Sequence, residues 1–143
     1  MSDPVTLAES IYLGDRSLKA ILIDGWLEQV SFRVDLISRL RPGTHSWEYY
    51  NEKDIEDGLI VLSGVQSITL APPGYVPNDY VNSFDVRPLP SPDTVTQAPA
   101  LFAFTMNVSS VARDGSSREV VVEVIAREMH LEDPSQPGLK ITD

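Results

Sequence analysis

The densest group of side chains able to do chemistry is an acidic stretch over residues 52–57, followed by Gly58. Clustered carboxylates are ligands that Ca²⁺ prefers, and paired carboxylates also hydrolyse glycosidic bonds. The stretch lacks the Asp-x-Asp-x-Asp-Gly spacing of a calcium-binding loop, and sugar hydrolysis usually needs a longer cleft than a domain of this size provides. We therefore favour an acidic loop that leads into a strand at Leu59, predict no metal and no cofactor, and keep cation binding as an alternative. The carboxylates of the stretch are Glu52, Asp54, Glu56 and Asp57.

Aromatic residues lie in the predicted loops on both sides of this acidic stretch. Trp and Tyr are frequent anchors of protein interfaces, and their rings also stack on sugars. A simpler alternative is that these rings cover the open end of a β core. Because negative charge attracts a cationic partner while rings supply affinity, we combine both sets into one candidate binding surface. Its members are Trp47, Tyr49, Tyr50, Tyr75 and Tyr80 together with the four carboxylates Glu52, Asp54, Glu56 and Asp57.

Other catalytic patterns are missing from the sequence. There is no cysteine, which excludes a thiolate nucleophile and a disulfide. The two histidines, His45 and His130, lie far apart and do not have the spacing of a metal-ligand pair. Neither a glycine-rich phosphate loop nor a Gly-x-Ser-x-Gly motif occurs. We therefore predict no catalytic residue, and an enzyme that uses Glu52, Glu56 and Asp57 is the least favoured hypothesis.

The net charge of −10 is concentrated in the middle of the chain. Residues 46–93 hold eight acidic side chains and only two basic ones. Such a surface repels nucleic-acid phosphates and anionic lipids. The charge therefore argues against a nucleic acid or a membrane as partner and favours a basic protein, although an acidic surface also serves solubility alone.

The elements that must position these residues are mostly strands. Asp3 and Pro4 are typical of a helix start, and the apolar spacing predicts one short helix that ends at Gly14. Alternating patterns then predict a hairpin that turns at Asp24-Gly25, with a return strand starting near Trp26. The other predicted strands are 59–62, 65–70 and 83–89, a hairpin over 101–127 that turns at Asp114-Gly115, and an extended tail.

About seven strands at hairpin spacing indicate a mainly β fold, an antiparallel β-sandwich or a partly open barrel, with one short N-terminal helix. The length suits a single domain over residues 1–143. Prolines between residues 88 and 99 predict an internal loop there. No signal peptide is evident at the N-terminus, and no apolar run could span a bilayer, so we expect a cytoplasmic protein.

Several short strings spread over nearly the whole chain carry a family likeness. They are Ile11-Tyr12-Leu13-Gly14-Asp15, Ile23-Asp24-Gly25-Trp26, Trp47-Glu48-Tyr49-Tyr50, Asp54-Ile55-Glu56-Asp57-Gly58, Pro77-Asn78-Asp79 and Leu131-Glu132-Asp133-Pro134. Together they resemble a family of small bacterial proteins known only as a domain of unknown function. In size and charge the chain is also similar to the immunity proteins of contact-dependent toxin systems. Neither likeness assigns a role to any residue.

Two functions remain in view. The first is a protein-binding module, of the immunity or accessory kind, that binds a basic protein partner through the candidate surface. The alternative is a β module that binds a small ligand or a carbohydrate without catalysis. The sequence predicts no oligomeric state.

Overall fold

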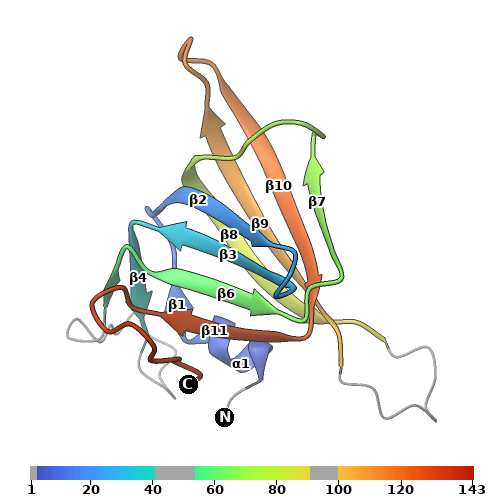
Figure 1. The fold of residues 1–143 in the computed structure, drawn as a ribbon. Helices are drawn as coiled ribbons and strands as arrows, with labels where there is room; N and C mark the ends of the chain where they lie inside the picture. Colours follow the sequence, from blue (N-terminus) through green and yellow to red (C-terminus); the bar gives the residue numbers. More distant parts are fainter. Residues whose placement is uncertain (1–2, 41–53, 91–99) are drawn as a thin grey trace.

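The computed structural model describes residues 3–40, 54–90 and 100–143, and its elements are mainly antiparallel strands. The described part contains one helix and eleven strands (Figure 1). The predicted class, mainly β with one short N-terminal helix, is confirmed. The elements are α1 (Pro4–Glu9), β1 (Ile11–Tyr12), β2 (Ser17–Asp24), β3 (Gln29–Val34), β4 (Leu36–Arg39), β5 (Ile55–Glu56), β6 (Leu59–Ser63), β7 (Ser67–Ala71), β8 (Asp79–Pro88), β9 (Phe102–Val111), β10 (Ser117–Ala126) and β11 (Glu128–Glu132).

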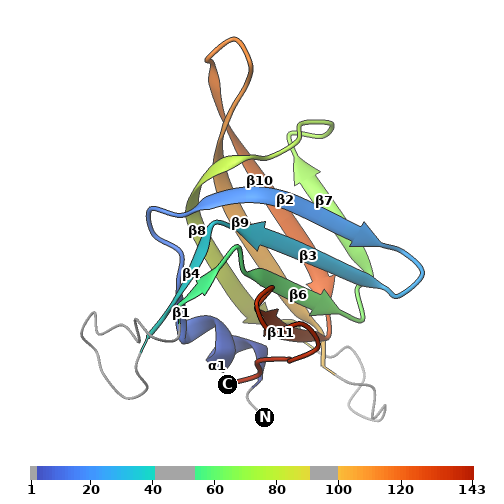
Figure 2. The ribbon, with the colours of Figure 1, turned by 60° about the vertical axis from the view of Figure 1, so that its left-hand side comes forward.

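Eight of these strands form one sheet in the order β11-β6-β3-β2-β8-β9-β10-β7, and β1-β4-β5 form a smaller sheet. In Figures 1 and 2 the strands β2, β3, β6 and β11 cross in front of β8, β9 and β10. The large sheet thus folds over on itself into two layers and does not close into a barrel. The strands outnumber the expected seven because the return strand of the first hairpin is divided into β3 and β4, and because β1, β5 and β11 were not predicted as strands.

The core lies between these two layers. Alternate residues along β9 and β10 are fully buried, whereas their neighbours are partly exposed, which is the period-two pattern of strands with one wet face. The predicted hairpin over 101–127 is confirmed by ten consecutive β9–β10 pairs. The largest fully buried side chains come from both layers and include Phe32, Ile60, Leu62, Phe104, Met106 and Leu131.

A bend in a pair of long strands joins the layers at one corner. Residues 59–71 run antiparallel to residues 121–132, first as β6 with β11 and then as β7 with β10. The register shifts by one residue between the two halves, because β6–β7 contains one extra residue. Gly64 takes a positive φ of 66° at this bulge, and the Arg127 N–H donates to the Ser63 carbonyl over 3.0 Å.

At the other corner the layers are joined by only two residue pairs. Ser17 and Leu18 of β2 pair with Tyr80 and Asp79 of β8, and beyond Leu18 the two strands separate. Helix α1 precedes β2 in the chain and packs against β8 and β11.

Two boundaries predicted from the sequence are wrong. The helix ends at Glu9 rather than near Gly14, because Ile11 and Tyr12 instead pair with β4 and Ile11 is buried in the core. The first hairpin returns at Gln29, not near Trp26. Its turn is longer than two residues because the Asp24 carboxylate accepts the Leu27 N–H over 3.0 Å.

The segment around residue 55, predicted to be loop, contains the short strand β5, which pairs with β4. Part of the predicted tail is strand β11, and the chain then returns so that Ile141 bridges Leu131. In the described ranges, no helix is long and apolar enough to cross a membrane.

Candidate functional site

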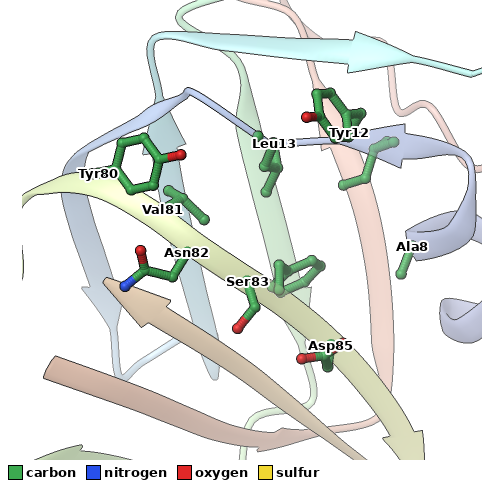
Figure 3. Close-up of a pocket in the computed structure, with 11 residues that line it drawn as sticks. Ala8, Tyr12, Leu13, Tyr80, Val81, Asn82, Ser83 and Asp85 are labelled. Carbon is green, nitrogen blue, oxygen red and sulfur yellow. The ribbon is translucent and has the colours of Figure 1, made fainter. Parts of the chain in front are cut away.

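A groove of about 390 Å³ runs between β8 and the segment that links α1 to β2 (Figure 3). Its apolar part includes Ile11, Leu13 and Val81, which are largely buried in the core. The half-buried Phe84 adds a ring, which meets Phe32 edge-on at 6.4 Å between centroids. Polar groups reach the groove from the rest of β8. The lining residues are Ala8, Ile11, Tyr12, Leu13, Gly14, Tyr80, Val81, Asn82, Ser83, Phe84 and Asp85.

The wall of the groove formed by β8 is a strand edge that, within the described residues, pairs with no strand beyond Tyr80 on this side. The Leu89 N–H donates to the Leu101 carbonyl over 2.9 Å, and hydrogen-bonded pairs alternate along an antiparallel ladder. By this alternation, Arg87 and Asp85 direct their main-chain groups toward β9. Those of Phe84 and Val86 point the opposite way, to the side on which α1 and the link from α1 to β2 lie.

Two features delimit this edge of β8. Toward its N-terminal end, the β8–β9 register shifts between Val81 and Ser83, so that Asn82 forms a bulge. The Asn82 amide is held on the outer face of the sheet, because Nδ2 donates to Asn107 Oδ1 and to Ser109 Oγ at 2.8 Å each. At the other end, Pro88 has no N–H to offer. The regular part of this edge therefore spans residues 83–87, and α1 and the link from α1 to β2 lie beside β8.

The charged residue that lines the groove, Asp85, is acidic, and none of the lining residues is basic. The Tyr80 hydroxyl donates to Asp15 Oδ1 over 3.0 Å. This hydrogen bond, together with the negative charge of Asp15, raises the pKa of the Tyr80 phenol above its usual range. Tyr80 therefore remains a neutral donor at physiological pH, and Asp85 adds a further carboxylate to the rim.

The predicted acidic residues that the structure describes lie on the side of the molecule formed by β4 and β5. The Asp54 carboxylate accepts the Arg39 N–H over 3.3 Å, and Glu56 is exposed on β5. Asp57 lies 2.5 Å from Lys19 Nζ. The hydrogen bond and the charge of Lys19 hold the pKa of the Asp57 carboxyl below its usual range. Trp47, Tyr49, Tyr50 and Glu52 lie outside the described residues.

The two described aromatic residues of the predicted surface occupy different places. Tyr80 lines the groove. The Tyr75 ring instead lies under the Arg118 guanidinium, 3.7 Å from its central carbon, next to the β9–β10 hairpin. Figure 2 shows this β7–β8 connection away from β4. The described members of the candidate surface therefore do not form one continuous patch.

An apolar surface that sequence reasoning missed lies on the β2–β3 hairpin, which projects from the front layer (Figure 2). We call it the hairpin tip. The Asp24 carboxylate and the Glu28 carbonyl hold this turn, since they accept N–H groups of Leu27 and Val65 at 3.0 Å. In the sequence, this surface was indicated only by Trp26, which follows Asp24-Gly25 directly. We assigned Trp26 to the return strand of the hairpin. The exposed fractions are 94% for Trp26, 64% for Ile23, 59% for Leu27 and 52% for Leu22.

Among the residues that the structure describes, no three His, Asp or Glu side chains come together in a way that could hold a metal ion. His130 is buried on β11, and its Nε2 lies 2.6 Å from Glu132 Oε2.

A family model described as a family of unknown function, DUF6258, matches residues 1–143. The chain belongs to this family. The resemblance noted in the sequence is thereby confirmed for a family of unknown function, while the likeness to immunity proteins stays a prediction. No curated protein and no solved structure matches the chain.

Proposed function

We propose that this domain is a protein-binding module that binds a basic protein partner through the hairpin tip. The observation that carries the proposal is the exposure of four large apolar side chains at one end of the β2–β3 hairpin: Trp26 and Leu27 on the turn, and Leu22 and Ile23 at the end of β2. Several large exposed apolar side chains so close together in the chain are uncommon on soluble monomers, and exposed apolar surface often marks an interaction site. A solitary exposed Leu would carry no such meaning.

Trp26 is the expected anchor of this contact. A Trp side chain removes about 150–250 Å² from water when buried, which corresponds to about 4–6 kcal/mol before the costs of association. The turn is already held by the hydrogen bonds of Asp24 and Glu28. Little conformational entropy is therefore lost when a partner covers it.

The charge of the chain favours a basic partner. Asp24 and Glu28 flank the apolar residues on the turn, and the whole chain carries −10. A field of this sign speeds the approach of a cationic protein. An immunity or accessory protein for a cationic toxin is one specific form of this function.

The test uses tagged wild-type protein, Trp26→Ser and the control Val76→Ser as baits in extracts of the native host, with quantitative mass spectrometry. Val76 is a matched control because it is apolar and 82% exposed, but it lies on the β7–β8 connection. We expect a basic protein that is retained by wild type and Val76→Ser. Trp26→Ser should weaken its binding by about 30-fold, the effect of losing a hot spot of about 2 kcal/mol. Equal retention by all three baits, or no basic protein at all, would contradict the proposal.

A further inference from the structure

We propose that the basic partner of the hairpin tip adds an antiparallel strand to the free edge of β7, under the tip, with apolar side chains facing inward and basic side chains facing outward. This inference rests on the proposed function for the partner, and it names the way in which that partner is recognised. Addition of an extended segment to a sheet edge is an established mode of protein recognition.

The strand β7 is the last strand of the eight-stranded sheet, and its strand partner is β10. In Figure 1 no described strand or helix lies beyond β7 on the side away from β10. The sequence of β7, Ser67-Ile68-Thr69-Leu70-Ala71, contains neither a charged residue nor a proline. These are the features that usually protect an edge from pairing with another chain, so β7 is open to an added strand.

Two residues of β7 offer their main-chain groups on this edge. The Ala112 N–H donates to the Ser116 carbonyl over 2.9 Å. Because hydrogen-bonded pairs alternate along an antiparallel ladder, the even-numbered residues of β10 bond to β9 and the odd-numbered ones face β7. The Ile125 carbonyl accordingly accepts an N–H from the segment just before β7. Ile68 and Leu70 pair with even-numbered residues of β10, so their N–H and carbonyl groups point away from β10.

The hairpin tip belongs to the opposite layer and extends over this edge. Ile23 pairs with the buried Val30, and directly opposite residues share one face, so the Ile23 side chain also points inward. Ile23 is nevertheless 64% exposed, because no described part of the opposite layer covers it. The Glu28 carbonyl accepts the Val65 N–H over 3.0 Å, two residues before β7, and Figure 2 shows the hairpin reaching past β7. A strand added to β7 extends that layer under Ile23.

The added strand meets different surroundings on its two faces. Ile68 and Leu70 pack partly against the core, and the residues opposite them in an antiparallel pair share their face. The partner residues that bond to Ile68 and Leu70 therefore point inward, toward Ile23, where apolar side chains fit. Their neighbours point outward, beside the exposed and uncharged residues of β7.

The outer face next to this edge carries a carboxylate. Thr69 pairs with Glu123 of β10, so a lysine or arginine opposite Thr69 on the added strand lies on the same face as Glu123. Arg87 Nη2 lies 3.7 Å from the Glu123 carboxylate, but a carboxylate has room to accept from two basic groups. Basic side chains therefore fit the outward positions of the added strand.

Charge and size distinguish a basic partner from a second copy of this chain. Residues 22–28 and 67–71 include Asp24 and Glu28 but no basic residue, and each copy carries −10. A cationic segment is therefore attracted, whereas a second copy is repelled. Two β7 edges would pair only five residues from each copy, and a stable interface uses roughly 20–30 residues on each side. A partner that also covers the hairpin tip does not have this limit.

The experiment titrates the full-length ¹⁵N-labelled protein with the capped peptide Lys-Val-Lys-Val-Lys and follows amide shifts by NMR. We expect the largest shifts at residues 67–71 and at Ile23. N-methylation of both valines should weaken binding about tenfold, because the valines donate to β7. N-methylation of two lysines should leave binding unchanged, because their N–H groups point away from β7. The version with Glu in place of Lys should bind severalfold more weakly, and this difference should shrink at high salt.

Two pairs of variants test the site itself. Leu70→Pro removes an N–H on the open edge and leaves the bonds to β10, so it should weaken binding about tenfold, whereas Leu70→Val should retain it. Ile23→Ser should weaken binding severalfold, because it removes the inward apolar contact. Leu22→Ser, on the outer face of the same strand, should not weaken it. The second pair does not depend on Leu70→Pro folding well.

Several results would overturn strand addition at β7. They are the absence of shifts at millimolar peptide, equal effects of the two methylations, equal binding of the Lys and Glu peptides, or equal effects of Ile23→Ser and Leu22→Ser. Concentration-dependent shifts at residues 67–71 without peptide would show a second copy on the edge and also overturn it.

Failure of this inference is distinguishable from failure of the proposed function. If Trp26→Ser loses the basic protein in host extracts while the peptide does not bind β7, the proposed function stands and strand addition fails. If the peptide binds β7 as expected but wild type retains no basic protein, the proposed function fails and the edge still accepts a strand.

Discussion

Asp57 is a residue whose partner comes from a distant part of the chain. Lys19 Nζ lies 2.5 Å from its carboxylate, and both side chains are substantially exposed, so the pair adds little to stability. Its clearest effect is on the pKa of Asp57, which lies below the usual 3.8. The interaction is fully present above that usual pKa and is lost as pH falls through the lowered pKa.

Replacing Lys19 by Met should therefore raise the pKa of Asp57 toward its usual value, which an NMR titration of the carboxyl carbon measures. Asp114 is the control in the same sample. Its pKa is lowered by hydrogen bonds from the Ser116 hydroxyl and N–H and should not change. An unchanged Asp57 titration would show that Lys19 does not cause its shift.

Tyr80 allows a matching test in the groove. The pKa of Tyr80 is raised by Asp15. The stabilising hydrogen bond between the two side chains is therefore fully present below the usual pKa of 10 and is lost as pH rises through the raised pKa. Asp15→Asn keeps the shape and tolerates the positive φ of 57° at this position. This substitution should lower the pKa of Tyr80, read from the ring carbon by NMR. A Tyr80 pKa equal to that of wild type would contradict the contact.

Asn78 fastens the β7–β8 connection to β9. Its side chain accepts the Val111 N–H over 2.8 Å and donates to the Val111 carbonyl over 3.1 Å, and thus replaces a strand neighbour. Asn78→Ala should lower the free energy of unfolding by about 1–2 kcal/mol in urea titrations, since two hydrogen bonds are lost. Asn78→Asp retains the acceptor and should fall in between. If Asn78→Ala is as stable as wild type, these bonds do not hold the connection.

Among the elements, the bend between β6 and β7 depends on Gly64. Its positive φ disfavours any side chain, and an added Cβ would lie 3.1 Å from the Arg127 side chain. Gly64→Ala should therefore destabilise the fold by about 1–3 kcal/mol, measured by urea unfolding.

Two control variants separate the two causes of this loss of stability, the positive φ and the contact with Arg127. Gly115 has a positive φ of 86° but no atom near an added Cβ, so Gly115→Ala measures backbone strain alone. Gly25 has neither constraint, and Gly25→Ala should be close to neutral. If Gly25→Ala and Gly64→Ala are equally stable, the bend does not need glycine.

The elements that sequence reasoning predicted well have local causes. Strict alternation from Phe102 to Val108 and the turn at Asp114-Gly115 are sufficient for the β9–β10 hairpin. The early end of α1 was not predictable in this way, because it depends on Ile11 pairing with Arg39. The groove is also a long-range effect, since it lies between β8 and the distant segment that links α1 to β2.

The same distinction applies to the candidate site. The sequence indicated Tyr80 and Asp57 as exposed polar or aromatic residues, but their partners, Asp15 and Lys19, lie far away along the chain. The hairpin tip was missed because exposure is not visible in residue type: Trp26 and Leu27 suit a strand core as well as a surface. Only the longer turn at Asp24 brings them into solvent.

For the whole molecule, the net charge of −10 sets the expected salt dependence of binding. Attraction over longer distances is screened once the Debye length falls to about 8–10 Å at physiological salt. The association rate with the basic partner should therefore fall as salt rises, whereas the dissociation rate should respond mainly to Trp26→Ser. Surface plasmon resonance at several salt concentrations measures the association rate and the dissociation rate separately. An association rate independent of salt would contradict the role of charge.

The most direct measurement for the binding proposal is site-specific cross-linking in living cells of the native host. A photoreactive benzoyl-phenylalanine replaces Trp26 in one strain and the equally accessible Val76 in another. We predict one prominent cross-linked product from position 26, containing a basic protein, and none from position 76. Identical product patterns from both positions, or no product from position 26, would contradict a binding function at the hairpin tip.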